Sequence, residues 1–138
     1  MISKETIQEV IDDQREDMAD VEVIPRDIEF EEHGNYVFVG LRRAGKSYLL
    51  YQRMQQLMTS GVDARDLLYV NFEDERLREM SSDDLNTILE VYYSRREAKP
   101  TMFLDEIQVV EGWEKFVRRL ADAHYRVYVT GSNSKMLS

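Results

Sequence analysis

One eight-residue segment constrains this chain more than any other, because its glycines and its Lys-Ser pair stand at a diagnostic spacing. Residues 40–47 read Gly-Leu-Arg-Arg-Ala-Gly-Lys-Ser and fit the pattern G-x-x-x-x-G-K-[ST] at every position. The glycines let the backbone curl until successive N–H groups converge on an anion, and a helix beginning there adds its positive end. The segment is therefore predicted to be a phosphate-binding loop, or Walker A motif.

The chemistry of this loop assigns roles to its last residues. Lys46 is expected to reach the β- and γ-phosphates of ATP and so to assist catalysis, and the Ser47 hydroxyl is expected to bind Mg²⁺. The apolar run 36–39 before the loop predicts a buried strand, and residues 48–60 after it predict a helix. The residues expected to contact the nucleotide are Gly40, Arg43, Ala44, Gly45, Lys46, Ser47 and Tyr48.

A second motif lies about sixty residues further on, which leaves room for one strand and two helices between the two. The apolar run 101–104 ends in Asp105 and Glu106, the form of a Walker B strand. Asp105 at the end of such a strand would organise Mg²⁺ and its water shell. Glu106, a second carboxylate directly after the first, is predicted to be the general base for an attacking water.

A third strand is predicted at residues 126–130, which alternate and are rich in β-branched side chains before the chain breaks at Gly131. Polar residues follow at the end of this strand. Thr130, Ser132 and Asn133 are candidates for a sensor that contacts the γ-phosphate or the attacking water. An equally weighted alternative is that residues 130–134 form only a turn and the N-cap of a following helix.

Taken together, four segments resemble the AAA-type ATP-binding proteins of bacteria and archaea: GLRRAGKS, LLYVNFEDER, MFLDEIQVVEGWEKFVRRLAD and VYVTGSNSKMLS. Those are two-part proteins with an N-terminal P-loop ATPase domain and a C-terminal half. The resemblance covers about residues 34–138. It implies a P-loop fold of the additional-strand, catalytic-glutamate type, with strand order 5-1-4-3-2. It also implies nucleotide and Mg²⁺ binding by Gly40, Gly45, Lys46 and Ser47, metal binding by Asp105, and water activation by Glu106.

The alternation of elements predicts an α/β protein with a parallel sheet flanked by helices. Strands are expected at about 36–39, 67–71, 101–105 and 126–130, and helices at about 46–60, 82–97 and 113–124. Ser81 or Ser82 is the expected N-cap of the second helix, and Gly61 the expected C-cap of the first. The fifth strand of the implied order is not found. Either residues 28–30 cover that edge of the sheet or the chain is truncated, and we favour truncation.

Charge divides the chain into two predicted parts. Residues 1–32 hold 12 acidic and 3 basic residues, whereas residues 33–138 hold 15 of each. We therefore expect an acidic N-terminal arm at 1–32 and the ATPase core at 33–138. Apolar residues fall near helical spacing in the arm, which favours a helix packed on the core with a solvated acidic face over a docking arm for a basic partner. These are Ile7, Val10, Ile11, Met18 and Val21.

Composition excludes several other classes. The chain has no cysteine, so disulfides and thiolate metal sites are excluded, and its two histidines stand alone. No apolar run approaches the roughly 18 residues that span a bilayer, so we expect a cytoplasmic protein without membrane contact. The net charge of −9 disfavours nonspecific nucleic-acid binding, which depends on neutralising phosphates.

Three functions follow from these motifs. The first is an ATP hydrolase that drives a conformational change in an attached C-terminal domain or a partner protein. The second is a nucleotide-dependent switch or scaffold with little turnover, and the third is a P-loop kinase. Glu106 directly after Asp105 favours hydrolysis, and no arginine-rich lid typical of a kinase is seen. A homo-oligomer, in which a neighbouring subunit supplies an arginine to the site, is left open.

Overall fold

Four parallel strands form the centre of the molecule, in a computed structural model that describes residues 1–19, 36–40 and 43–132. The strands are β1 (Tyr36–Gly40), β2 (Leu67–Asn71), β3 (Thr101–Asp105) and β4 (Val127–Ser132). They pair in the order β1-β4-β3-β2. The predicted α/β class is confirmed, and the order agrees with the 1-4-3-2 part of the implied topology. The described residues contain no fifth strand, and residues 28–30 lie outside them.

The two central strands are deeply buried. Met102, Phe103 and Leu104 of β3 and Tyr128 of β4 are completely inaccessible to solvent, and Val129 of β4 is nearly so. Continuous apolar runs of this kind are typical of parallel strands that are covered on both faces. Because all four strands run in the same direction, their carboxyl ends lie along one edge of the sheet. That edge is where open α/β sheets bind ligands.

In the part of the chain that the structure describes, four α-helices surround the sheet: α1 (Lys4–Ala19), α2 (Arg43–Thr59), α3 (Ser82–Tyr93) and α4 (Trp113–Asp122). Short 3₁₀ helices, which the sequence did not predict, stand in the connections at η1 (Ala64–Asp66), η2 (Glu75–Leu77) and η3 (Ile107–Val109). The expected caps are present. Ser81 caps α3 in a capping box with Asp84, and Gly61 after α2 has a φ of 109°.

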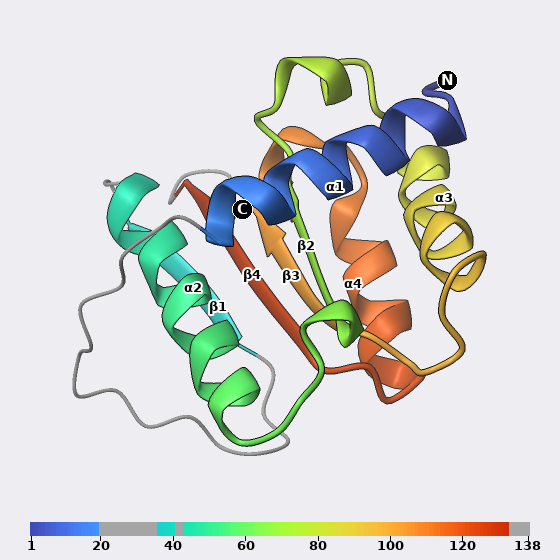
Figure 1. Cartoon of the computed structure of the whole chain (residues 1–138). Coiled ribbons are helices and arrows are strands. Elements are labelled where there is room, and N and C mark those ends of the chain that lie inside the picture. Colours follow the sequence, from blue (N-terminus) through green and yellow to red (C-terminus); the bar gives the residue numbers. More distant parts are fainter. Residues whose placement is uncertain (20–35, 41–42, 133–138) are drawn as a thin grey trace.

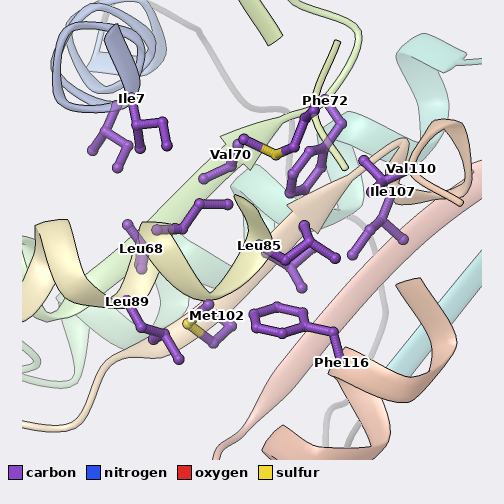
Figure 2. Packing of buried hydrophobic residues seen from close by; sticks show 14 of the residues in the cluster. Ile7, Leu68, Val70, Phe72, Leu85, Leu89, Met102, Ile107, Val110 and Phe116 are labelled. Carbon is purple, nitrogen blue, oxygen red and sulfur yellow. The ribbon is translucent and has the colours of Figure 1, made fainter. Parts of the chain in front are cut away.

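Two hydrophobic clusters cover the two faces of the sheet. The larger cluster combines residues of α1, α3 and α4 with alternate residues of β2, β3 and β4 such as Leu68, Met102 and Leu104. Figure 2 shows part of it, with Leu85 and Phe116 directed toward the strands. The smaller cluster combines Leu50, Met54 and Leu57 of α2 with Leu67, Tyr69, Phe103 and Tyr128. Helix α2 therefore packs on one face of the sheet, and α3 and α4 pack on the other (Figure 1).

Helix α1 lies along the open edge of β2, beside α3 (Figure 1). Its apolar side chains Ile7, Val10 and Ile11 are buried in the larger cluster. The buried Gln14 side chain donates to the Asn71 carbonyl at 3.1 Å and accepts from the Asn71 N–H at 2.9 Å. A side chain thus satisfies the backbone groups that an edge strand would otherwise present to another chain.

Part of the acidic face of α1 pairs with basic residues of the rest of the molecule. Asp13 accepts from Arg76 at 2.7 Å, and Asp12 lies 3.3 Å from Arg95. These contacts hold the helix against the connections that follow β2 and α3. Val21, the last of the apolar residues expected on the helix, lies outside the described residues.

Helix α3 ends at Tyr93, four residues earlier than predicted. The chain folds back there because the Tyr92 hydroxyl donates to the Ala98 carbonyl at 2.7 Å. Arg96 pairs with Asp66, the last residue of η1, which directly precedes β2. Arg95 and Arg96, which the predicted helix would include, thus follow α3 and form ion pairs.

Candidate functional site

The loop residues lie at the junction of β1 and α2, at the carboxyl edge of the sheet. Strand β1 ends at Gly40, and α2 begins at Arg43, three residues before the predicted start. Arg43, Ala44, Gly45 and Lys46 thus form the first turn of the helix, where backbone N–H groups lack partners within the helix. Leu41 and Arg42 lie outside the described residues. The arrangement of strand, glycine loop and helix N-terminus is suited to an anion.

Asp105 is the centre of the site. It is the last residue of β3 and is completely buried. Its Oδ2 accepts hydrogen bonds from Ser47 Oγ at 2.7 Å and from the Tyr69 hydroxyl at 2.6 Å. Its Oδ1 accepts one from Thr130 Oγ1 at 2.5 Å. Hydroxyls from α2, β2 and β4 therefore converge on one carboxylate, which satisfies the requirement that a buried charged group be hydrogen-bonded.

Thr130 connects the two acidic residues. Its hydroxyl donates to Asp105 and also accepts from the backbone N–H of Glu106 at 2.9 Å. Thr130 is completely buried within β4, which continues to Ser132. The alternative that residues 130–134 form a turn is therefore wrong for 130–132. Ser132 pairs in register with Gly40 at the start of the loop, and Asn133 lies outside the described residues.

Glu106 has an unusual backbone conformation. Its φ of 56° and ψ of 43° place it in the left-handed region, which a residue with a side chain seldom adopts. It is 2% exposed, and its Oε2 accepts a hydrogen bond from Gln108 Nε2 at 2.7 Å. Outliers of this kind cluster at functional sites, where the surrounding structure holds the strained residue. Here the end of β3 and the start of η3, where Ile107 is completely buried, fix Glu106 on both sides.

Two tyrosines that the sequence did not single out extend the network. The Tyr69 hydroxyl, bonded to Asp105, lies 3.4 Å from the hydroxyl of Tyr51 on α2. Burial and the nearby Asp105 charge raise the pKa of Tyr69 far above its ordinary value, so its hydroxyl stays protonated and can donate. Burial likewise raises the pKa of Tyr51. A tyrosine within an otherwise apolar strand is the only sequence signal for Tyr69, and core packing explains that signal equally well.

Tyr48, a predicted nucleotide contact, and Asp74, which follows β2 at the same edge of the sheet, make other contacts in this structure. Tyr48 is 39% exposed and packs edge-on against the Tyr51 ring, with 6.0 Å between the ring centroids. Asp74, in the acidic run after β2, caps η2 and pairs with Arg76 at 2.9 Å. That ion pair lowers the pKa of Asp74, so its role in this structure is to hold the connection after β2.

The donor set at Asp105 suits a small hard cation that keeps other ligands. In the part of the chain that the structure describes, no three His, Cys, Asp or Glu side chains gather into a cage for a metal ion. Ser47 and Asp105 instead offer one hydroxyl and one carboxylate side by side. Two protein ligands of this kind fit Mg²⁺ that also binds phosphate oxygens and water. Within the same described residues, no helix is long and apolar enough to cross a membrane.

Comparison with known proteins agrees with this geometry. The chain is 43% identical over its whole length to an uncharacterized protein of Methanocaldococcus jannaschii, of which it spans 31%. It is 35% identical over 74% of its length to an uncharacterized protein of Haemophilus influenzae, of which it spans 26%. No solved structure shows a significant match. The family model described as AAA domain matches residues 32–138, the stretch that contains the loop, Asp105 and Thr130. The chain therefore belongs to the AAA domain family.

Proposed function

We propose that this domain binds ATP with Mg²⁺ through residues 40–48 and hydrolyses it, with Asp105 organising the metal and Glu106 activating water. Membership of the AAA domain family indicates a nucleotide-binding ATPase in general terms. One observation carries the finer proposal: the 2.7 Å hydrogen bond between Ser47 Oγ and Asp105 Oδ2, which are 58 residues apart in sequence. It supports a shared metal site between the loop helix and the central strand.

The chemistry of these two side chains fits Mg²⁺. When bound, the ion would neutralise charge that develops on the phosphate oxygens. Ser47 and Asp105 would hold it at the carboxyl edge of the sheet, beside the first turn of α2. That helix end brings backbone N–H groups and the positive end of the helix dipole to the phosphates. Lys46, in the same turn, would add a positive charge close to the β- and γ-phosphates.

Glu106 would accept the proton of the attacking water. It directly follows the residue that we assign to the metal, so a water near the γ-phosphate would lie within its reach. Thr130 would assist by holding the Glu106 backbone and the Asp105 carboxylate in one arrangement, since its hydroxyl contacts both. This makes Thr130 our preferred sensor among Thr130, Ser132 and Asn133.

One contact favours the alternative of a nucleotide-dependent switch with little turnover. Glu106 is 2% exposed, and one of its carboxylate oxygens is bonded to Gln108 at 2.7 Å. Glu106 can activate a water only after its hydrogen bond to Gln108 breaks and its carboxylate becomes accessible. Hydrolysis would therefore depend on a conformational change that nucleotide or another module induces. Phosphate release measured at saturating ATP distinguishes the two functions.

We further propose that the nucleotide cycle acts on an attached or partner module. The chain spans less than a third of each of the two relatives, which supports additional domains in proteins of this kind. Nucleotide binding and hydrolysis can change such a module only if the different nucleotide states of the ATPase domain contact it differently.

Calorimetry of ATP binding in the presence of Mg²⁺ tests the proposal. Lys46→Ala should weaken the affinity at least tenfold, because a charge-assisted contact contributes about 1.5–3 kcal/mol and each decade corresponds to about 1.4 kcal/mol. Lys115→Ala is the matched control, since this exposed lysine lies on α4 at the opposite face of the sheet. Equal ATP affinity in the wild type and Lys46→Ala would refute the proposed site.

A further inference from the structure

We infer that Tyr69 is a positioning residue that orients Asp105 toward the metal and couples it to the loop helix α2. This inference rests on the proposed function, in which Asp105 organises Mg²⁺. Tyr69 lies outside both sequence motifs. It belongs to β2, whereas the loop follows β1 and Asp105 ends β3.

The hydroxyl of Tyr69 meets the oxygen of Asp105 that also binds Ser47. The distance from the Tyr69 hydroxyl to Asp105 Oδ2 is 2.6 Å, and that from Ser47 Oγ to the same atom is 2.7 Å. The other oxygen, Oδ1, is held by Thr130. A carboxylate can rotate about its Cβ–Cγ bond, and contacts at both oxygens from different elements restrict that rotation. Tyr69 therefore fixes the direction of the oxygen that faces the proposed metal position.

Packing makes the Tyr69 ring a rigid support. The residue is 4% exposed and belongs to the cluster beneath α2, together with Leu50, Phe103 and Tyr128. In the sheet it pairs in register with Phe103, two residues before Asp105. The ring thus starts on the neighbouring strand, and only its hydroxyl reaches the end of β3. A phenol whose ring is held in this way places its one donor in a fixed position.

Helix α2 contacts the Tyr69–Asp105 pair at two points. Ser47 and Tyr51 are four residues apart and lie on the same face of the helix. Ser47 bonds to Asp105, and the Tyr51 hydroxyl lies 3.4 Å from that of Tyr69. The rings of Tyr51 and Tyr69 also contact each other, with centroids 5.7 Å apart. A closed circuit of contacts therefore joins the loop helix to the strand-end carboxylate. It runs from Ser47 to Asp105, Tyr69 and Tyr51, and Tyr51 lies on the same helix as Ser47.

The hydroxyl of Tyr69 contacts Asp105, the residue assigned to the metal, and lies beside the Tyr51 hydroxyl on α2. Loss of its hydroxyl should consequently affect the metal-dependent part of ATP binding and spare the part that does not need metal.

The test is calorimetry of ATP binding by the full chain, in excess Mg²⁺ and in EDTA. Wild type should bind ATP more tightly with Mg²⁺; absence of that gain would refute the proposed metal site itself and leave nothing for Tyr69 to position. If the gain is present, Tyr69→Phe should reduce it about tenfold, which corresponds to about 1.4 kcal/mol, and leave affinity in EDTA within about twofold.

Tyr128→Phe is the control for loss of a buried tyrosine hydroxyl. Tyr128 belongs to the same cluster, but its hydroxyl accepts from Arg53 at 2.8 Å and from Arg126 at 3.1 Å. This variant should lower the midpoint of thermal unfolding while keeping the full Mg²⁺-dependent gain. The inference is overturned if Tyr69→Phe keeps the wild-type gain, or if it weakens ATP binding equally with Mg²⁺ and with EDTA. The latter result would show a structural role only.

Discussion

The two faces of the sheet differ in the side chains that cover them. The face covered by α1, α3 and α4 carries an apolar cluster that includes Leu85, Ile88 and Leu104, all completely buried. On the face beneath α2, the buried side chains that the structure describes form a cluster of seven that includes two tyrosines, and buried Arg53 bonds to one of them. Apolar burial is nondirectional, whereas hydrogen bonds fix positions. We therefore expect changes on the first face to affect mainly stability, and changes on the second to affect also the groups around Asp105.

The largest effect that this division predicts is on turnover. Glu106→Gln keeps the size of the side chain but removes the base, so turnover at saturating ATP should fall by about 10²–10⁴-fold. ATP affinity and thermal stability should stay close to wild type. Phosphate release by the full-length protein measures the effect, because attached domains or a neighbour's arginine contribute to the rate.

Asp105→Asn is the companion variant for this experiment. It should weaken Mg²⁺-dependent ATP binding as well as turnover, because Asp105 is assigned to the metal and accepts three hydroxyl donors. Equal phosphate release by wild type and Glu106→Gln would mean that Glu106 is not the base. The switch function would then replace the hydrolase.

The next largest effect concerns stability on the apolar face. Leu85→Ala should lower the free energy of unfolding by about 2–5 kcal/mol, the usual cost of a cavity at a completely buried leucine. The Mg²⁺-dependent gain in ATP affinity should not change, because Leu85 lies on α3 in the larger cluster (Figure 2). Chemical denaturation and calorimetry on the same samples measure both quantities.

Leu50→Ala makes the matched change on the other face. Leu50 is also completely buried, but it lies on α2, three residues after Ser47, and packs in the cluster of Tyr69. This variant should lose both stability and Mg²⁺-dependent affinity. If Leu85→Ala and Leu50→Ala affect ATP binding equally, the two faces are not functionally distinct.

The sequence predicted most strands and helices because each of them depends on a short, continuous stretch of residues. Buried parallel strands are apolar runs, so β2 and β3 were placed at their observed bounds, and the loop and strand-end motifs led to Ser47 and Asp105. Tyr69, Tyr51 and Gln108 were missed because their contacts depend on which strand and helix become neighbours. The end of α3 was misplaced for the same reason, since Arg96 finds Asp66 thirty residues away. Alternation and spacing carry no information about such pairs.

A smaller effect is expected where α1 covers the edge of β2. Gln14→Ala removes both hydrogen bonds to the Asn71 backbone and leaves those groups without this partner. The free energy of unfolding should fall by about 1–3 kcal/mol. Gln8→Ala on the same helix is the control, because Gln8 bonds only to Asp12 one turn away at 2.9 Å, a pair of the kind that contributes about 0.2–0.5 kcal/mol. Equal losses in the two variants would argue against a specific role of Gln14 at the edge.

The smallest effect is predicted for Tyr51→Phe, at the far end of the circuit beneath α2. The distance between the Tyr51 and Tyr69 hydroxyls, 3.4 Å, is at the limit of a hydrogen bond, so the Mg²⁺-dependent gain in ATP affinity should fall by no more than about threefold. Because Tyr51 is proposed to act through Tyr69, the same change in the Tyr69→Phe background should have no further effect. A double-mutant cycle measured by calorimetry gives this coupling directly. Additive losses would show that Tyr51 acts independently of Tyr69, and the circuit would reduce to the direct contacts of Asp105.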